Sequence, residues 1–507
     1  MVLNCEGMMS KSKTASFIHN FPLITSYKNR KELEARFNAA QQLKNVVLQE
    51  ALKRADRYLQ DETVKEAKRL YSKAHRTKDK NEKQQLKEKA IPLFNAARKK
   101  YQLEKYSLDS IGGQHRSNAP HLYTHIDSQT TKSICQRVMK SINGYLLGKN
   151  GRPHFAYKES IQSIESPTNG QGIIVNLEKG IVNWNACRKH LGHKSSNLIL
   201  HVKFDNRNNR AADVEAHALA HRVKYCRILK KQHGRFTNYT LQVVFEGTPY
   251  ERSELKEKQQ QRLDCYGVDM NMHHIDLASN NDAISLPYCR SAVAHVEMEK
   301  EVKRLQRKMS RTLFLNNLDC YTTREKTKGR QTITTHQRKK GIKFPNISHN
   351  YLKLKCRKAN LQRKLAAGRT DSHGYTVNQL LKVCGDLKIE KVWYRAWQCS
   401  RYGRAIGLNA PATLEAKLVR RAEQFDNNVM FVDPFKTALS QYCHRCGNKT
   451  QKKLSNRVHT CCDLNLDRDL YTALLVANTD FIGGEWLVDN DMVEQAIIEH
   501  PEKYKRK

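Results

Sequence analysis

The spacing of hydrophobic residues changes early in the chain, from a short apolar run to a long helical pattern. Residues 14–24 are mostly apolar and predict a strand. From 30 to 106, apolar residues such as Leu33, Phe37 and Leu43 recur at helical spacing among many charged residues. The first hundred residues are therefore expected to form one strand followed by densely charged helices.

A β-rich region is predicted next. One more helix is expected around 134–147, and apolar runs then occupy 173–177, 198–204 and 239–245. Each run is short and rich in β-branched residues, as strands are. We therefore expect residues 153–246 to be dominated by β-structure.

The second half of the chain begins with another strand pattern. A charged linker, 251–262, precedes residues 263–288, which predict a strand, a turn and two further strand segments. Residues 296–366 predict a long basic helical region, interrupted by a polar loop near 322–347. This order of strand, hairpin and strand, with the acid Asp269 in the first strand, resembles the start of the ribonuclease H-like fold.

Charge narrows the class of partner. The formal net charge is +40, because 90 Lys and Arg residues stand against 50 Asp and Glu residues. Such a surplus repels itself unless a polyanion neutralises it, and nucleic acid is the expected polyanion. No long apolar run or amphipathic anchor indicates a membrane, and residues 1–13 lack the apolar core of a signal peptide. Most of the 14 cysteines are scattered, which indicates a reducing interior.

Three carboxylates attract attention because of the elements that carry them. Asp269 lies inside an apolar strand pattern, where an unpaired charge is costly, although an Asp at a strand end can also bond a backbone turn. Glu390 ends the short alternating run 386–390, and pairing with a neighbouring lysine is the plainer interpretation. Asp469 lies in the first turn of a predicted amphipathic helix, where Asp467 is a natural N-cap.

Taken together, the three acids predict a metal centre. Phosphodiester hydrolysis needs an activated water and a stabilised leaving oxygen, and two Mg²⁺ ions roughly 3.5–4 Å apart supply both. Mg²⁺ prefers carboxylate oxygens and needs few protein ligands. We also expect the small side chain of Ala473, one turn after Asp469, to leave room for such a centre.

A cysteine cluster near the C-terminal end predicts a structural zinc site. Cys443 and Cys446 have the CxxC spacing of a zinc knuckle, and the adjacent pair Cys461 and Cys462 follows. Adjacent side chains normally diverge, so one cysteine of the second pair is open to replacement, and His459 is the substitute ligand. The loop between the pairs is basic and polar, as expected where a metal supplies the folding energy.

The order of these parts resembles the transposon-encoded TnpB nucleases and the type V CRISPR effectors. The resemblance is carried by the block 390–414, by 432–440 ahead of the knuckle, and by the Asp-Arg-Asp sequence that ends at Asp469. Three departures stand out: Tyr471 where the family often has Asn, Met270-Asn271 where Leu-Gly is commoner, and the compressed second cysteine pair.

The resemblance implies a fold, a set of domains and a site. It implies a bilobed α+β multidomain protein with a β-barrel wedge domain, a helical recognition lobe, a ribonuclease H-like RuvC domain and an inserted zinc ribbon. It assigns 1–30 to the first strand of the wedge domain, 31–149 to the recognition lobe, 150–260 to the wedge β-barrel, 261–440 to the RuvC domain with a helical insertion, 441–463 to a zinc-ribbon target-nucleic-acid-binding insert, and 464–507 to the RuvC C-terminal helix and tail. Asp269, Glu390 and Asp469 match the family's catalytic acids.

The function implied is an RNA-guided DNA endonuclease with one RuvC site. Its cofactors would be Mg²⁺, structural Zn²⁺ and a guide RNA, and its partner a target DNA with a short flanking motif. The expected location is the prokaryotic cytoplasm, in association with the nucleoid, and the oligomeric state stays open. Two alternatives remain: an RNA-guided DNA-binding protein with weak or no cleavage, and a ribonuclease H-like DNA transposase.

Overall fold

The computed structural model describes residues 15–505 with several gaps. The gaps are 78, 158, 186–196, 206–209, 234–235, 252–256, 258–263, 289–291, 329–330, 343 and 453–455. Residues 1–13 and most of the linker 251–262 lie outside the described residues. The chain divides into two compact units, Met1–Tyr250 and Glu251–Lys507. No helix in the described part has the length and hydropathy needed to cross a membrane.

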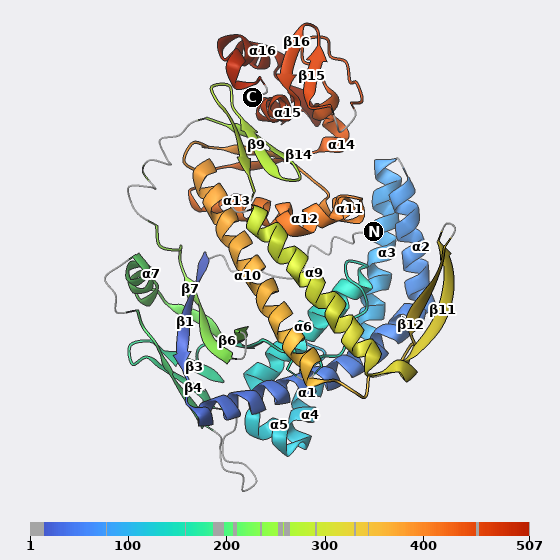
Figure 1. The fold of residues 1–507 in the computed structure, drawn as a ribbon, viewed down its shortest axis with the longest axis vertical. Helices are drawn as coiled ribbons and strands as arrows, with labels where there is room; N and C mark the ends of the chain where they lie inside the picture. The colour runs from blue at the N-terminus through green and yellow to red at the C-terminus, as the bar shows by residue number, and fades with distance from the viewer. Residues whose placement is uncertain are drawn as a thin grey trace. The chain divides into compact units, whose positions relative to one another are not determined.

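The helices predicted for the first unit are present (Figure 1). The range 30–106 contains α1 (Tyr27–Gln60), α2 (Glu62–Arg76) and α3 (Lys80–Lys100), and the helix expected around 134–147 is α6 (Ser128–Leu146). Two further short helices, α4 (Asp109–Asn118) and α5 (Pro120–His125), lie between them along the chain. Local capping sets several boundaries, because the side chains of Ser26, Asp61 and Asp79 accept backbone N–H bonds in the first turns of α1, α2 and α3. The apolar face of α1 is buried in the core of this unit.

The β-structure of the first unit is one seven-stranded antiparallel sheet. Its strands are β1 (Ser16–Ile24), β2 (Ser163–Ser166), β3 (Ile173–Asn176), β4 (Ile181–Asn185), β5 (Asn197–Val202), β6 (Val223–His233) and β7 (Phe236–Glu246), and α7 (Arg210–Leu219) follows β5. The order is β2-β6-β7-β1-β5-β4-β3. Among the described residues β2 and β3 are the sheet's two edges, so the closed wedge barrel that we expected is not found there.

A buried polar cluster ties helix to sheet in this unit. Asp127 caps α6 and accepts bonds from the backbone N–H of Thr130 at 2.8 Å and from Nε1 of Trp184 on β4 at 2.9 Å. The guanidinium of Arg36 on α1 donates to the carbonyl of Trp184 at 3.0 Å and lies over its ring. Buried charges are tolerated when they are bonded in this way.

The second unit is built on a five-stranded mixed sheet. Its strands are β8 (Tyr266–Met270), β9 (His274–Ala278), β10 (Ala283–Pro287), β13 (Leu387–Glu390) and β14 (Val429–Val432), in the order β10-β9-β8-β13-β14. β8, β9 and β10 pair antiparallel, which confirms the strand and hairpin predicted over 263–288. β13 pairs parallel with both β8 and β14, so β8 is the central strand.

The long basic helical region is present, but its interruption is not a loop. α9 (Ala292–Leu315) and α10 (His349–Leu380) pack on each other, as Figure 1 shows. Between them β11 (Tyr321–Lys328) and β12 (Gln331–Arg338) form a two-stranded antiparallel sheet after the short helix η1 (Leu318–Cys320). The prediction of a polar loop near 322–347 was therefore wrong for most of its length. Threonine and isoleucine in this polar stretch favour strands.

The remaining elements of the second unit are short. They are α11 (Tyr394–Cys399), α12 (Gly403–Asn409), α13 (Pro411–Gln424), α14 (Pro434–Thr437), η2 (Leu439–Gln441), β15 (Val458–Cys461), β16 (Leu464–Asp467), α15 (Arg468–Ala477), β17 (Thr479–Ile482), β18 (Glu485–Val488), α16 (Asn490–Glu499) and η3 (Pro501–Lys503). α15 packs against β8 and β9. A Cβ atom built on Gly267 of β8 would lie 1.9 Å from the Ala473 carbonyl oxygen, so the strand and the helix touch backbone to backbone.

Candidate active site and cysteine cluster

Three secondary-structure elements bring the predicted acids to one place. Asp269 lies on β8, and Glu390 is the last residue of the neighbouring parallel strand β13. The β8–β13 register aligns Ile389 with Val268, which puts Glu390 beside Asp269. Asp469 lies in the first turn of α15, which packs on β8, and the cap that starts this helix is Asp467, as predicted.

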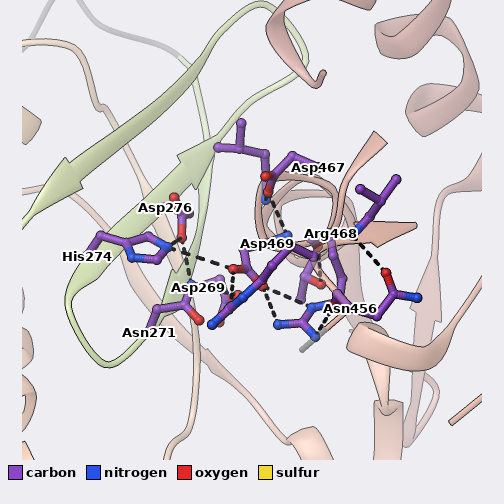
Figure 2. Close-up of polar contacts among 12 residues, drawn as sticks. Asp269, Asn271, His274, Asp276, Asn456, Asp467, Arg468 and Asp469 are labelled. Atoms are coloured by element: carbon purple, nitrogen blue, oxygen red, sulfur yellow. Dashed lines mark hydrogen bonds and ion pairs between the residues drawn. The ribbon is translucent and has the colours of Figure 1, made fainter. Parts of the chain in front are cut away.

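A fourth carboxylate lies in the same cluster. Asp276 of β9 is directly opposite Asp269 in the antiparallel register and is 2 % exposed. His274 Nε2 lies 3.0 Å from an oxygen of Asp276 and 3.8 Å from an oxygen of Asp469. Asn271 Nδ2 donates to Asp276 at 2.6 Å. Figure 2 shows His274 and Asp276 turned toward Asp469, with Asp269 beside them.

Burial and mutual repulsion perturb the acids strongly. Burial, followed by the negative charges of Glu390, Asp469 and Asp276, raises the pKa of Asp269 well above its usual value. Burial raises the pKa of Glu390 to about 7. Carboxylates in this state hold protons near neutral pH, unless a cation binds between them.

Cationic side chains already neutralise Asp469. Arg457 Nη1 lies 2.7 Å from one oxygen of Asp469, and Arg468 Nη2 lies 2.8 Å from the other. Burial acts to raise the pKa of Asp469, yet His274 and these two arginines outweigh it, and the pKa falls to about 2. The hydrogen bond to Asp276 and then that to Asp469 raise the pKa of His274 to about 10.

The donor set suits a hard divalent cation on the side of Asp269 and Glu390. In the described part of the chain, no hydrogen bond or ion pair involves the Glu390 carboxylate, although this side chain is half-buried. The neighbouring lysine Lys388, which could have paired with Glu390, pairs instead with Asp480 at 2.7 Å. Oxygen ligands and an uncompensated negative charge are what Mg²⁺ requires.

The four cysteines of the predicted zinc site converge. The Sγ atoms of Cys443, Cys446, Cys461 and Cys462 all lie within 4.8 Å of one another. Cys446 and Cys461 are separated by 3.7 Å, as are Cys461 and Cys462. Tetrahedral zinc with Zn–S bonds of about 2.3 Å places its sulfurs about 3.8 Å apart, so the donor set fits this ion.

A tight turn explains how two adjacent cysteines can face one point. β15 ends at Cys461 and β16 begins at its partner Leu464, so only Cys462 and Asp463 form the turn. Both have positive φ, 49° and 65°, as type I′ hairpin turns require. The turn takes Cys462 out of the strand alternation that would send its side chain to the opposite face.

His459, the suggested substitute ligand, lies outside this group of sulfurs. It is 1 % exposed, its Nδ1 contacts Lys452, and its ring packs on Tyr471 with centroids 4.3 Å apart. The hydroxyl oxygen of Tyr471 accepts the backbone N–H bond of His444 at 3.1 Å. Tyr471, which departs from the family pattern, therefore connects α15 to the cysteine loop.

Sequence reasoning missed Asp276, His274, Arg457 and Arg468 as parts of the site. His274 and Asp276 occur in an apolar–polar strand pattern that says nothing of which strand they oppose. Arg457 lies in the loop between the two cysteine pairs, which was expected only to be basic and polar. An alternating position in the strand next to Asp269 was the available signal for Asp276, because opposed residues of antiparallel strands share a face.

Comparisons with known proteins match one segment of the chain to a family model. Residues 412–476 match the family model "Cas12f1-like, TNB domain". A search of curated proteins finds no match. Among solved structures, the chain is similar to a Cas12f1–sgRNA–target DNA complex solved by cryo-EM, with 12% identity, 92% of this chain and 99% of that chain covered, and a TM-score of 0.46. It is also similar to the mini-RNA-guided endonuclease CRISPR-Cas_phi3, with 10% identity, 96% and 92% covered, and a TM-score of 0.29.

The matched segment 412–476 includes the four cysteines and Asp469, and lies between the strand that carries Glu390 and the end of α15. The resemblance to compact type V effectors that the sequence indicated is thereby confirmed for this part of the chain.

Proposed function

We propose that the chain is an RNA-guided DNA endonuclease that cleaves phosphodiesters at a single RuvC-type site. The observation that carries the proposal is the convergence of Asp269, Glu390 and Asp469 from β8, β13 and α15, with the Glu390 carboxylate unpaired among the described residues. The Cas12f1-like family match and the net charge of +40 support nucleic acid as the partner.

The residues of the cluster have different roles in the proposed reaction. Asp269 and Glu390 would hold Mg²⁺ together with Asp469, and ions bound there would activate a water and stabilise the leaving oxygen. Arg457 and Arg468 hold the carboxylate of Asp469 in place. Asp276 faces Asp269 and would add negative charge to the metal site or position its ligands.

We further propose that Cys443, Cys446, Cys461 and Cys462 hold Zn²⁺ and that this ion has a structural role. The tight β15–β16 turn places two non-glycine residues at positive φ, and a metal offsets the cost of that conformation. A guide RNA would select the DNA by base pairing, and the basic protein surface would hold the duplex by its backbone.

A second candidate is an RNA-guided DNA-binding protein with little cleavage. The two arginines on Asp469 favour it, because both oxygens of this carboxylate already have cationic partners at 2.7 and 2.8 Å. A metal ion must displace one of these contacts or share an oxygen with it. A cleavage assay with Mg²⁺ and Mn²⁺ decides between the two candidates.

The decisive experiment begins with the RNA. The chain is expressed with its flanking genomic DNA and purified, and the bound RNA is sequenced. A discrete RNA with a constant scaffold and a guide segment supports RNA guidance. Absence of a specific RNA would overturn it.

The loaded protein is then tested on DNA matching the guide. Cleavage should need a divalent cation and should be abolished by D269N, E390Q or D469N, while binding of the target persists. D282N, which changes an acid in the β9–β10 turn on the same sheet, is the matched control and should cleave normally. Loss of binding together with cleavage would count against the assigned roles.

A further inference from the structure

Two aromatic side chains are strongly exposed at the end of the second sheet where Glu390 lies. β13 and β14 are parallel neighbours, and their register pairs Glu390 with Val432, the last residue of each strand. Trp393 follows Glu390 by three residues, and Phe435 follows Val432 by three residues. Their exposed fractions are 65 % and 86 %. Single exposed apolar residues are common, whereas two large rings at one end of a sheet indicate a binding surface.

The backbone that carries Phe435 is fixed. The side chain of Asp433 caps α14 and accepts the N–H bond of Phe435 at 3.0 Å. The hydroxyl of Thr437 donates to the carbonyl of Asp433, also at 3.0 Å. In the described part of the chain, the Phe435 ring contacts no other aromatic ring and no cation. This ring is therefore held on a short capped turn with its surface open to solvent.

Trp393 differs from the two aromatic residues that follow it in α11. The hydroxyl of Tyr394 donates to Glu415 of α13. The ring of Tyr394 packs edge-on against Trp397, with centroids 5.8 Å apart. Both rings therefore have partners inside the unit, whereas the Trp393 indole has no ring or cation contact among the described residues.

Basic side chains alternate with the exposed rings along the chain. Lys391, Arg395 and Lys436 are exposed, and none of them forms an ion pair with a described residue. Arg404, farther along the chain, is different because it pairs with Glu299 at 2.9 Å. Proteins hold single-stranded nucleic acid with this combination, in which cations bind the phosphates and aromatic rings stack on the bases.

We propose that Trp393 and Phe435 form a base-stacking subsite that holds single-stranded DNA beside the metal centre at Glu390. In sheets with parallel strands, ligands bind beyond the carboxyl ends of the strands, where both rings lie. A DNA strand whose phosphate is at the metal centre brings the neighbouring bases to this end of the sheet. The proposal rests on the proposed function, because its ligand is the strand to be cleaved.

The chemistry of the surface selects a single strand of nucleic acid. Inside a duplex both faces of a base are covered by its neighbours, so a protein ring can stack only on an unstacked base. Stacking tolerates every base, as an enzyme directed by a guide requires. The nearby acids Asp433 and Glu415 are already bonded to Phe435 and Tyr394, so the unpaired charges of this surface are positive and favour a polyanion.

The test is a double-mutant cycle between protein and DNA, with the full chain and its bound guide RNA. W393A/F435A removes both rings from the protein. In the target DNA, one base at a time near the cleavage position is replaced by an abasic site. The control F481A removes a half-exposed ring from the β17–β18 hairpin of the same unit. The measurement is the single-turnover rate of cleavage for each protein with each DNA.

Stacking predicts losses that do not add. With wild-type protein, removal of one or two particular bases should slow cleavage about ten-fold, the scale of one stacked base. W393A/F435A should slow cleavage of the intact target about ten-fold or more, and removal of the same bases should slow it no further. F481A should match the wild type at every position. W393F/F435Y keeps both rings and should restore the rate, whereas W393L/F435L keeps only apolar bulk and should not.

Four results would overturn the proposal. Wild-type cleavage could be insensitive to base removal, a result that needs no variant to fold, or the losses from base and ring removal could add, which means that ring and base do not touch. Loss of guide RNA from W393A/F435A would make RNA the ligand, and an altered oligomeric state would make it a second copy of the chain. Failure of the proposed function looks different, because wild-type protein would then carry no specific RNA or leave the intact target uncut.

Discussion

Asp276 is the residue whose environment most extends the candidate site. It is almost fully buried opposite Asp269, and its carboxylate bonds to His274 and Asn271. We predict that D276N lowers cleavage by about ten-fold to one-hundred-fold, because residues that support metal ligands commonly act on metal affinity at that scale. The measurement is the cleavage rate over a Mg²⁺ titration, in which the half-saturating concentration should rise.

A purely structural role for Asp276 predicts a different result. The variant would then have a lower melting temperature, and its Mg²⁺ dependence would match that of the wild type. D282N, in the adjoining turn, gives the baseline for losing an acid from this sheet.

Glu390 should make the effect of metal on stability depend on pH. Its pKa is raised to about 7 by burial, so without metal the folded state holds a proton that the unfolded state releases at lower pH. Stability from this group is complete at low pH and is lost as pH rises through about 7. We predict that Mg²⁺ raises the melting temperature more at about pH 8 than at about pH 6. In E390Q this difference should shrink markedly, and an unchanged difference would contradict the assignment.

At the residue scale, sequence reasoning could find acids but not their neighbours. Asp269, Glu390 and Asp469 could be chosen because the strand or helix predicted around each of them makes a carboxylate at that position notable. For Asp276 the sequence offered only an alternating position in the next strand, and the register that places it opposite Asp269 is not specified by a single sequence. Likewise Ala473 was expected to leave room for metal, whereas the structure places its backbone against Gly267.

At the scale of elements, the contact between β8 and α15 positions Asp469 relative to Asp269. A Cβ on Gly267 would lie 1.9 Å from the Ala473 carbonyl and 2.3 Å from the Ala477 nitrogen. We predict that G267A forces the helix away from the strand, costs about 1–3 kcal/mol of folding free energy, and lowers cleavage about 100-fold through misplacement of Asp469. Thermal unfolding and cleavage rates measure the two effects.

The matched control is G407A in α12. A Cβ at Gly407 meets no atom within 4 Å, so alanine should leave cleavage unchanged and stability equal or slightly higher. Equal behaviour of G267A and G407A would show that the close β8–α15 approach does not set the site geometry.

The cysteine loop depends on α15 through Tyr471. The Tyr471 hydroxyl accepts the buried N–H of His444, and His444 in turn contacts Glu494 at 2.6 Å. We predict that Y471F costs about 1–3 kcal/mol, because a buried donor loses its acceptor, and that a chelator removes zinc faster from this variant. In Y442F the missing partner is only the side chain of Asn490, and zinc release should stay at the wild-type rate.

Helices and strands were predicted best where the hydrophobic periodicity of the sequence was strong. The charged helices of 30–106 and the strands that carry Asp269 and Glu390 appear as expected. The β11–β12 hairpin was missed because its residues are mostly polar and show no regular hydrophobic alternation. Repeated threonines, which are enriched in strands, were the signal that could have revealed it.

At the scale of the whole molecule, the order of strands in the first sheet could not be predicted from the sequence. A β-rich region was predicted for 153–246, but closure into a barrel depends on pairings between distant strands. Strand β1, from the start of the chain, lies between β5 and β7 in the centre of the first sheet. Pairings between strands so far apart along the chain leave no local pattern to detect.

The charge of the whole chain predicts opposite effects of salt in the free and loaded states. At +40 the free protein repels itself, so added salt should screen that repulsion and raise its melting temperature. A bound guide RNA replaces repulsion with attraction, and salt weakens that attraction by competing for phosphates. The loaded protein should therefore melt highest at low salt and lower as salt increases. Melting curves from about 0.05 to about 0.5 M salt test this, with heparin as a polyanion control. A rise with salt in both states would mean that the basic surface and the RNA do not meet, because only their contact can reverse the sign.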